Sequence, residues 1–280
     1  MKCVYINLDR ATDRREALER NFAQCAAPGW TLHRFAALDT AYVQSRPVPG
    51  KATPVERACF SSHHQVIAEN CDDDAALFIL EDDSLFCAKS CRLIDKAVAE
   101  LDAAQPDWDI LWVDAGLAPI AGMAELVKLK QEHYVSQNRL IFIDAKRLNI
   151  FGANAYIING KRKRHLLDRI DAITDINFAY DNFLKYLIDK GQIQGRMVVP
   201  LLVSLSIETA RTSQIQTEDR ARQLMLWNLF RRRLWVGEPE PHEADILAQI
   251  DATTSPEAKA YGTIWGALAG IYYGLDRPKH

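Results

Sequence analysis

Short apolar runs alternate with amphipathic segments to about residue 215, and this alternation restricts the fold more than any other feature of the sequence. The runs at residues 3–8, 75–80 and 155–158 predict buried strands, whereas residues 55–70 have the pattern of a helix. Strands that alternate with helices are typical of layered α/β domains. We therefore expect one α/β domain over residues 1–215.

Two local features predict interruptions within this domain. The strand at residues 109–113 runs into Asp114-Ala115-Gly116, which we interpret as a turn. Pro200 lies inside the apolar run 197–205, and proline cannot donate a hydrogen bond to a neighbouring strand. We therefore expect residues 197–205 to form an edge strand or a bent strand.

Beyond residue 215 the pattern indicates helices alone, which predicts a C-terminal helical extension over residues 216–280. Within it, residues 220–235 combine an apolar stripe with Arg231-Arg232-Arg233. One interpretation is a helix that holds the protein peripherally against anionic lipid. The other is a helix that packs on the domain and keeps its arginines in water.

Composition excludes some classes of protein. The formal charge of −3 argues against a nucleic-acid partner. The six cysteines have no Cys-x-x-Cys or Cys/His zinc spacing, which indicates reduced and mostly buried thiols. Apolar segments stay below the roughly 18 residues of a membrane span. We expect a cytoplasmic protein, with peripheral contact at the inner membrane face as the alternative, and make no prediction of its oligomeric state.

Three consecutive acids, Glu81-Asp82-Asp83, directly follow the apolar run 75–80. Adjacent carboxylates repel one another and raise one another's pKa, and a divalent cation such as Mg²⁺ or Mn²⁺ relieves this repulsion. Open α/β sheets also bind their ligands at the carboxyl ends of strands. The triplet therefore predicts a metal and phosphate site, and a solvated acidic loop is the alternative.

The segments around the triplet resemble, in order, the motifs of glycosyltransferase family 25, which contains lipopolysaccharide and collagen galactosyltransferases. The matching segments are VYINLDR (4–10) with arginines at 14 and 15, CFSSH (59–63), LFILEDD (77–83), WDIL (108–111), AYII (155–158) and DNFL (181–184). The resemblance fades after about residue 215. It implies a GT-A-like, single nucleotide-binding Rossmann-like domain, with the C-terminal helical extension outside the match.

The resemblance also implies a metal, Mn²⁺ or Mg²⁺, at an Asp-x-Asp-type motif. Asp83 would ligate this metal, and Glu81 or Asp82 would contact the metal or the donor ribose. We therefore name Glu81 and Asp83 as metal ligands. Many GT-A enzymes add a late histidine, but none lies between His165 and His242. The metal would then rely on the triplet, the donor diphosphate and water.

For the nucleotide-sugar donor, the resemblance implies that Asn7, Leu8 and Asp9 frame the base and ribose. Arg14 or Arg15 would meet the diphosphate, because a guanidinium pairs well with phosphate oxygens; a solvated helix face is the alternative for either. A further expectation concerns the helix at residues 55–70. One of its two adjacent histidines faces inward, and His63 is either a contact of the donor or a hydrogen-bonded core residue.

The implied activity is an inverting, UDP-sugar-dependent transfer, with galactose from UDP-galactose as the expected donor sugar. The acceptor would be a saccharide, such as a lipopolysaccharide or a glycoprotein glycan. Inversion needs a general base that removes the acceptor proton, and the resemblance selects Asp181, with Asp114 and Glu208 in reserve. The alternative is a non-catalytic relative that serves as a binding or adhesion module. The intact triplet favours the enzyme.

Overall fold

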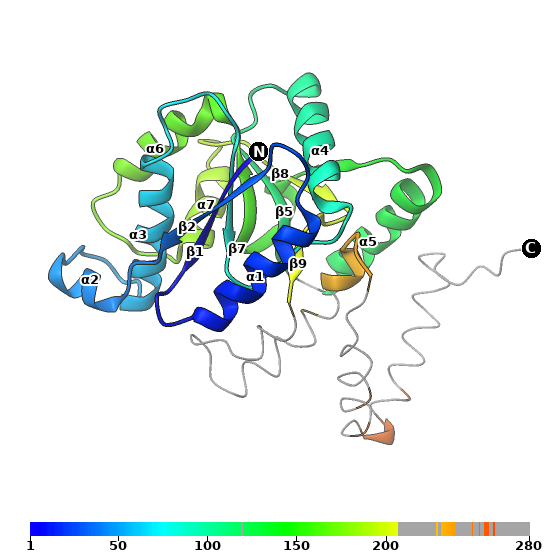
Figure 1. The fold of residues 1–280 in the computed structure, drawn as a ribbon, viewed down its shortest axis with the longest axis horizontal. Helices are drawn as coiled ribbons and strands as arrows, with labels where there is room; N and C mark the ends of the chain where they lie inside the picture. The colour runs from blue at the N-terminus through cyan, green and yellow to red at the C-terminus, as the bar shows by residue number, and fades with distance from the viewer. Residues whose placement is uncertain are drawn as a thin grey trace, which may run out of the picture.

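The computed structural model describes residues 1–118, 120–206 and 231–238, together with positions 228, 248, 252, 255–257 and 260 (Figure 1). A seven-stranded sheet runs through the domain in the order β2-β1-β3-β7-β5-β8-β6, and β4 pairs with β9 beside it. The strands are β1 (Lys2–Asn7), β2 (Thr31–Ala36), β3 (Leu77–Glu81), β4 (Ser84–Leu85), β5 (Ile110–Ala118), β6 (Ile141–Asp144), β7 (Asn149–Ile158), β8 (Gly195–Val199) and β9 (Ser204–Leu205).

The sheet is mainly parallel. β1 runs parallel to both β2 and β3, and β5 runs parallel to β8. β7 lies antiparallel between β3 and β5, and β6 is antiparallel to β8 at the edge. β3 and β5 therefore point the same way, and the carboxyl ends of β1 and β3 meet at one edge of the sheet. The α/β class predicted from the sequence is confirmed.

Helices cover both faces of this sheet (Figure 1). They are α1 (Thr12–Cys25), α2 (Thr40–Ser45), α3 (Pro54–Ala68), α4 (Ser90–Ala104), α5 (Ile120–Leu129), α6 (Lys163–Asp171) and α7 (Tyr180–Asp189), with shorter turns η1 (Lys130–Val135), η2 (Ala145–Arg147) and η3 (Gly160–Arg162). α3 begins with a capping box, in which Thr53 and Glu56 bond each other's backbone amides.

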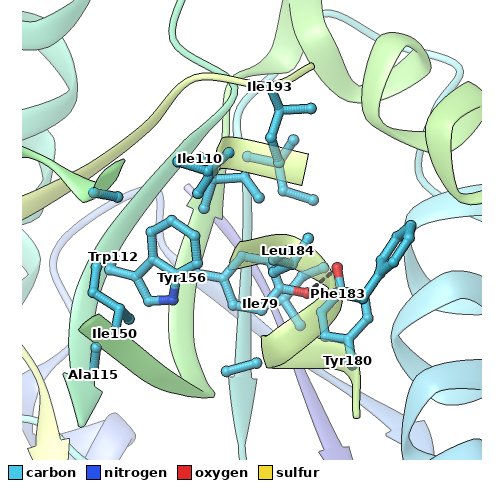
Figure 2. Packing of buried hydrophobic residues seen from close by; sticks show 14 of the residues in the cluster. Ile79, Ile110, Trp112, Ala115, Ile150, Tyr156, Tyr180, Phe183, Leu184 and Ile193 are labelled. Carbon is cyan, nitrogen blue, oxygen red and sulfur yellow. Dashed lines mark hydrogen bonds between the residues drawn. The ribbon is translucent and has the colours of Figure 1, made fainter. Parts of the chain in front are cut away.

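Alternation along β3 divides the apolar side chains between two cores, because successive residues of a strand point to opposite faces. Leu77 and Ile79 enter the core under α3, α6 and α7, whereas Phe78 and Leu80 enter the core under α1 and α4. Figure 2 shows the first core, where Ile79 lies among aromatic side chains from the neighbouring strands and α7. The same alternation brings Glu81 to the α3 face.

Two local predictions were wrong. β5 does not turn at residues 114–116 but continues to Ala118, with register irregularities on either side of Asp114. Gly116 allows this, because a Cβ there would lie 2.3 Å from the ring of Phe151. The run 197–205 is neither an edge strand nor one bent strand, because β8 ends before Pro200 and lies between β5 and β6, and residues 204–205 form β9 beside the main sheet.

Residues 231–236 pack against the domain. The backbone amide of Leu201 donates to the carbonyl of Leu234 at 2.9 Å, and the amide of Val236 donates to the carbonyl of Leu201 at 3.0 Å. Leu234 and Trp235 are buried in the two cores. The predicted boundary at residue 215 lies outside the described residues, but residues 231–236 are part of the same packed body as residues 1–206.

The segment packs on the domain, as the second interpretation expected, and Arg233 is exposed, but the expectation for the other two arginines needs correction. Arg231 and Arg232 are buried, so they contact neither solvent nor lipid. Arg231 forms a bidentate pair with the buried carboxylate of Asp114, and Arg232 donates to the carbonyl of Leu205 at 3.0 Å. Among the described residues, no helix is long and apolar enough to cross a bilayer.

Candidate active site

The acidic triplet lies at the carboxyl end of β3. Glu81 is the last residue of the strand, and Asp82 and Asp83 form the tight turn into β4. A segment distant in sequence also holds the turn, because the backbone amide of Ser206 donates to the carbonyl of Asp83 at 2.8 Å. Its position is therefore set by two separate segments of sequence.

Side chains from β1 and α1 hold the two aspartates. The guanidinium of Arg14 spans them, with Nη1 at 2.9 Å from Oδ1 of Asp82 and Nη2 at 3.0 Å from Oδ2 of Asp83. Nδ2 of Asn7 donates to Oδ2 of Asp82 at 2.8 Å. Arg14 is therefore bound to the acidic turn, where it stabilises the carboxylates. Its expected contact with a diphosphate remains a prediction, and it would have to be made from this position.

The guanidinium of Arg14 pairs with two of the three acids and leaves Glu81 without an ion pair among the described residues. Burial and the neighbouring Asp83 and Asp82 raise the pKa of Glu81 to about 8, against the opposing effect of Arg14. Burial also raises the pKa of Asp82, which Arg14 again opposes. Oδ1 of Asp83 is buried without a hydrogen-bond partner in the described part of the chain. This surplus of oxygen ligands fits a hard divalent cation such as Mn²⁺ or Mg²⁺.

A cavity of about 190 Å³ opens beside the turn. Its walls come from the end of β1, the start of α1, residues 37–40 and one face of α3. Five of the residues predicted to bind the donor line it: Leu8, Arg14, His63, Glu81 and Asp82.

The other three residues predicted to bind the donor, Asn7, Asp9 and Arg15, do not line this cavity. Asn7 is buried behind Asp82. Asp9 is exposed and pairs with Arg34 at 2.5 Å. Arg15 acts electrostatically on Tyr5 in the core under α1.

The three candidate bases have different surroundings. Asp181 lies in the first turn of α7 and accepts hydrogen bonds from the amides of Gly152 at 2.7 Å and Asn182 at 2.8 Å. It does not line the 190 Å³ cavity, although its negative charge contributes to the raised pKa of Glu81. Asp114 is fully buried with both oxygens bound by Arg231, which leaves no free base there. Glu208 lies outside the described residues.

The sequence prediction missed Cys59. Its Sγ, a ring nitrogen of His63 and a carboxylate oxygen of Glu81 lie within 4.8 Å of one another. All six cysteines are free thiols, as expected. Spacing alone could have paired Cys59 with His63, since residues four apart share a helix face. The third member comes from a distant strand, so a search for local zinc spacing does not find it.

Residues 1–184 match the profile of a family described as glycosyltransferase family 25 (LPS biosynthesis protein). The chain belongs to glycosyltransferase family 25. The family is one of glycosyltransferases, which agrees with the acidic turn and cavity described above. No curated protein matches the chain.

Similar solved structures are also glycosyltransferases. GlyE of Streptococcus pneumoniae TIGR4 is 10% identical, with a TM-score of 0.36, and the match covers 69% of this chain and 44% of GlyE. The bifunctional WbbM is 10% identical, with a TM-score of 0.44, covering 93% of this chain and 50% of WbbM. The galactosyltransferase LgtC is 13% identical, with a TM-score of 0.37, and the match covers 87% of this chain and 99% of LgtC. The chain thus spans about half the length of the first two, and superposition this loose says nothing about individual residues.

Proposed function

We propose that this family 25 enzyme transfers galactose from UDP-galactose to a saccharide acceptor, such as a lipopolysaccharide or glycoprotein glycan, with inversion and with Mn²⁺ or Mg²⁺. One observation carries the proposal. Three carboxylates, two of them paired with the guanidinium of Arg14, lie at the carboxyl end of β3, which runs parallel to β1, and a cavity opens beside them. Such strand ends are where open α/β sheets bind nucleotides.

Glu81 and Asp83 would hold the cation, because a cation would stabilise the charged form of Glu81, which burial and the two aspartates disfavour, and because Oδ1 of Asp83 is buried without a partner among the described residues. A bound cation would stabilise the negative charge that develops on the departing UDP. Arg14 and Asn7 would keep the turn in place before and during the reaction. The cavity is smaller than the roughly 300–1,000 Å³ of complete ligand pockets, so we assign to it one part of the donor beside the metal.

Asp181 remains our proposed general base. It would take the proton of the acceptor hydroxyl while that oxygen attacks the anomeric carbon and UDP leaves. Its amide hydrogen bonds from Gly152 and Asn182 would hold the carboxylate in one orientation. A non-catalytic binding module is the second candidate, and the surplus of carboxylates at the turn favours the enzyme over it.

A cytoplasmic location, with peripheral contact at the inner membrane face, is also part of this proposal. Six free thiols support a reducing compartment. Any contact made by residues 220–235 would have to form without Arg231 and Arg232, which are buried against the domain.

The test is calorimetric titration of UDP-galactose with and without Mn²⁺, on the wild type and on Asp83→Asn. We expect binding that requires Mn²⁺ and that weakens at least about tenfold in the variant. Asp107→Asn is the matched control, because Asp107 is exposed and precedes β5. It therefore lies at the amino ends of the parallel strands, whereas Asp83 lies at their carboxyl ends. Metal-independent binding that Asp83→Asn leaves unchanged would contradict the proposal.

A further inference from the structure

The part of the cavity wall formed by α3 and the end of β3 carries three potential metal ligands of different chemistry. Cys59 and His63 lie four residues apart on α3, so their side chains share one face of the helix. Glu81 meets them from the end of β3. Their ligand atoms lie within 4.8 Å of one another, and all three residues line the cavity.

His63 is held in a form that can bind a metal. Its ring stacks on Tyr180 with 4.3 Å between centroids, and Nδ1 lies 2.9 Å from the hydroxyl of Tyr156. That hydroxyl donates its own proton to Tyr180 at 3.1 Å, as the dashed line in Figure 2 marks, so its oxygen accepts from Nδ1–H. The lone pair of the imidazole is then on Nε2. A partner of this kind orients histidine ligands in known metal sites.

Nε2 of His63 has no partner in the described part of the structure. The residue is completely buried, and this nitrogen accepts no hydrogen bond there. Leaving a buried polar atom unsatisfied is costly, so such an atom calls for an explanation, and a bound water or ion is one. Burial also lowers the pKa of His63 to about 3, which keeps the ring neutral at physiological pH.

We propose that Cys59 Sγ, His63 Nε2 and a carboxylate oxygen of Glu81 form a site for a borderline-soft divalent ion of the Zn²⁺ type. Sulfur, imidazole and carboxylate together suit such an ion, whereas Mn²⁺ and Mg²⁺ prefer oxygen alone. Ligand atoms of a tetrahedral zinc site are separated by roughly 3.3–3.8 Å, so small rotations of Cys59 and Glu81 complete the geometry. The fourth position faces the cavity and is open to water or another ligand.

Binding at this site moves protons and charge. The thiol of Cys59 loses its proton to solvent as the sulfur–metal bond forms, so affinity rises with pH. The ion also takes up Glu81, which the Mn²⁺ site would need. If the proposed function holds, Zn²⁺ therefore inhibits the Mn²⁺-dependent transfer by competing for this shared carboxylate.

Cobalt provides a direct test, because Co²⁺ replaces Zn²⁺ and reports a thiolate ligand by a charge-transfer band in the near ultraviolet. The full chain, stripped with a chelator, is titrated with Co²⁺, followed by Zn²⁺. We expect a band that Zn²⁺ abolishes, that Cys59→Ser lacks, and that Cys71→Ser retains. Cys71 is a matched control, since it is half-buried and bonded to the carbonyl of Ile67, outside the cluster.

Absence of the band from the wild type, or its persistence in Cys59→Ser, would overturn the proposed site. Far-ultraviolet circular dichroism, unchanged in Cys59→Ser, confirms that the variant is folded. His63→Gln is expected to weaken Co²⁺ binding at least about tenfold. Unchanged affinity in His63→Gln would remove that residue from the site.

A second arm separates this site from the proposed function. In the transfer assay with Mn²⁺, Zn²⁺ should inhibit the wild type and Cys71→Ser, while Cys59→Ser should need at least about ten times more Zn²⁺. Equal inhibition of all three proteins would refute the competition for Glu81. A cobalt band without any transfer activity would refute the proposed function alone, because the band does not depend on catalysis.

Discussion

Glu81 stands at the meeting point of two sets of ligands. On one side lie the aspartates that Arg14 binds, and on the other lie Cys59 and His63 on α3. Its own carboxylate has no hydrogen bond within the described part of the chain, and the negative charges of Asp82 and Asp83 are close to it. The fold therefore places the Glu81 carboxylate in an environment that destabilises its charged form. A bound cation would stabilise that charged form.

This penalty predicts a dependence of stability on pH. The pKa of Glu81 rises from 4.5 to about 8 on folding, so between these values the folded state holds the proton more tightly than the unfolded chain. Stability contributed by this group therefore falls as pH rises through that window, and the loss is complete above about pH 8. Glu81→Gln cannot ionise and escapes the loss. Without metal, its gain over the wild type should increase by about 4 kcal/mol between pH 5 and pH 9, at about 1.4 kcal/mol for each pH unit below the raised pKa.

Urea unfolding at both pH values, in the presence of a chelator, measures this difference. Glu69→Gln is the control, because Glu69 is an exposed carboxylate that directly follows α3. A difference between Glu81→Gln and the wild type that stays constant with pH would show that the charged form of Glu81 is not penalised in the folded protein.

Single residues were predictable from the sequence only where local context decides their position. The triplet follows an apolar strand, and this alone placed Glu81, Asp82 and Asp83 at the edge of the sheet. The partners of Asp9 and Arg14 are set by contacts across the fold, so their ion pairs with Arg34 and the acidic turn could not be read from neighbouring residues. Cys59 was missed for the same reason.

Among the elements, the segment at residues 231–236 departs most from expectation. Its sequence pattern resembles an amphipathic surface helix, yet its first two arginines are buried. Asp114, on the irregular part of β5, is the reason, because a fully buried carboxylate requires a nearby positive charge. Apolar runs identified most strands correctly, whereas the interior position of β8 and the burial of this segment depend on which distant elements pair.

The pair between Arg231 and Asp114 can be tested directly. Arg231→Met should lower the free energy of unfolding by about 3–5 kcal/mol, because it leaves the carboxylate buried and unpaired. Adding Asp114→Asn should recover much of this loss, since the neutral amide costs far less to bury. Arg233→Met is the comparison at a neighbouring exposed arginine and should change stability little. If the double variant is no more stable than Arg231→Met, loss of packing rather than an unpaired charge is the cause.

At the scale of the whole molecule, the question is where the folded unit ends. The sequence pattern predicted a domain that ends near residue 215, because the family motifs and the strand–helix alternation both fade there. The structure continues the domain into residues 231–236, which contribute Leu234 and Trp235 to the cores and hydrogen bonds to Leu201. The same body also carries β9 and Ser206, which support the acidic turn.

A chain that ends at residue 215 should therefore be much less stable than one that ends at residue 240. The shorter chain uncovers the core around Leu201 and leaves Asp114 buried without Arg231, and losing that partner alone costs about 3–5 kcal/mol. Urea unfolding followed by tryptophan fluorescence compares the two chains, with the full chain as reference. Because the acidic turn belongs to the same packed body, we also expect the shorter chain to bind Mn²⁺ and UDP-galactose more weakly. Equal unfolding free energies for the two truncated chains would show that the domain ends near residue 215 and that residues 231–236 do not contribute to its stability.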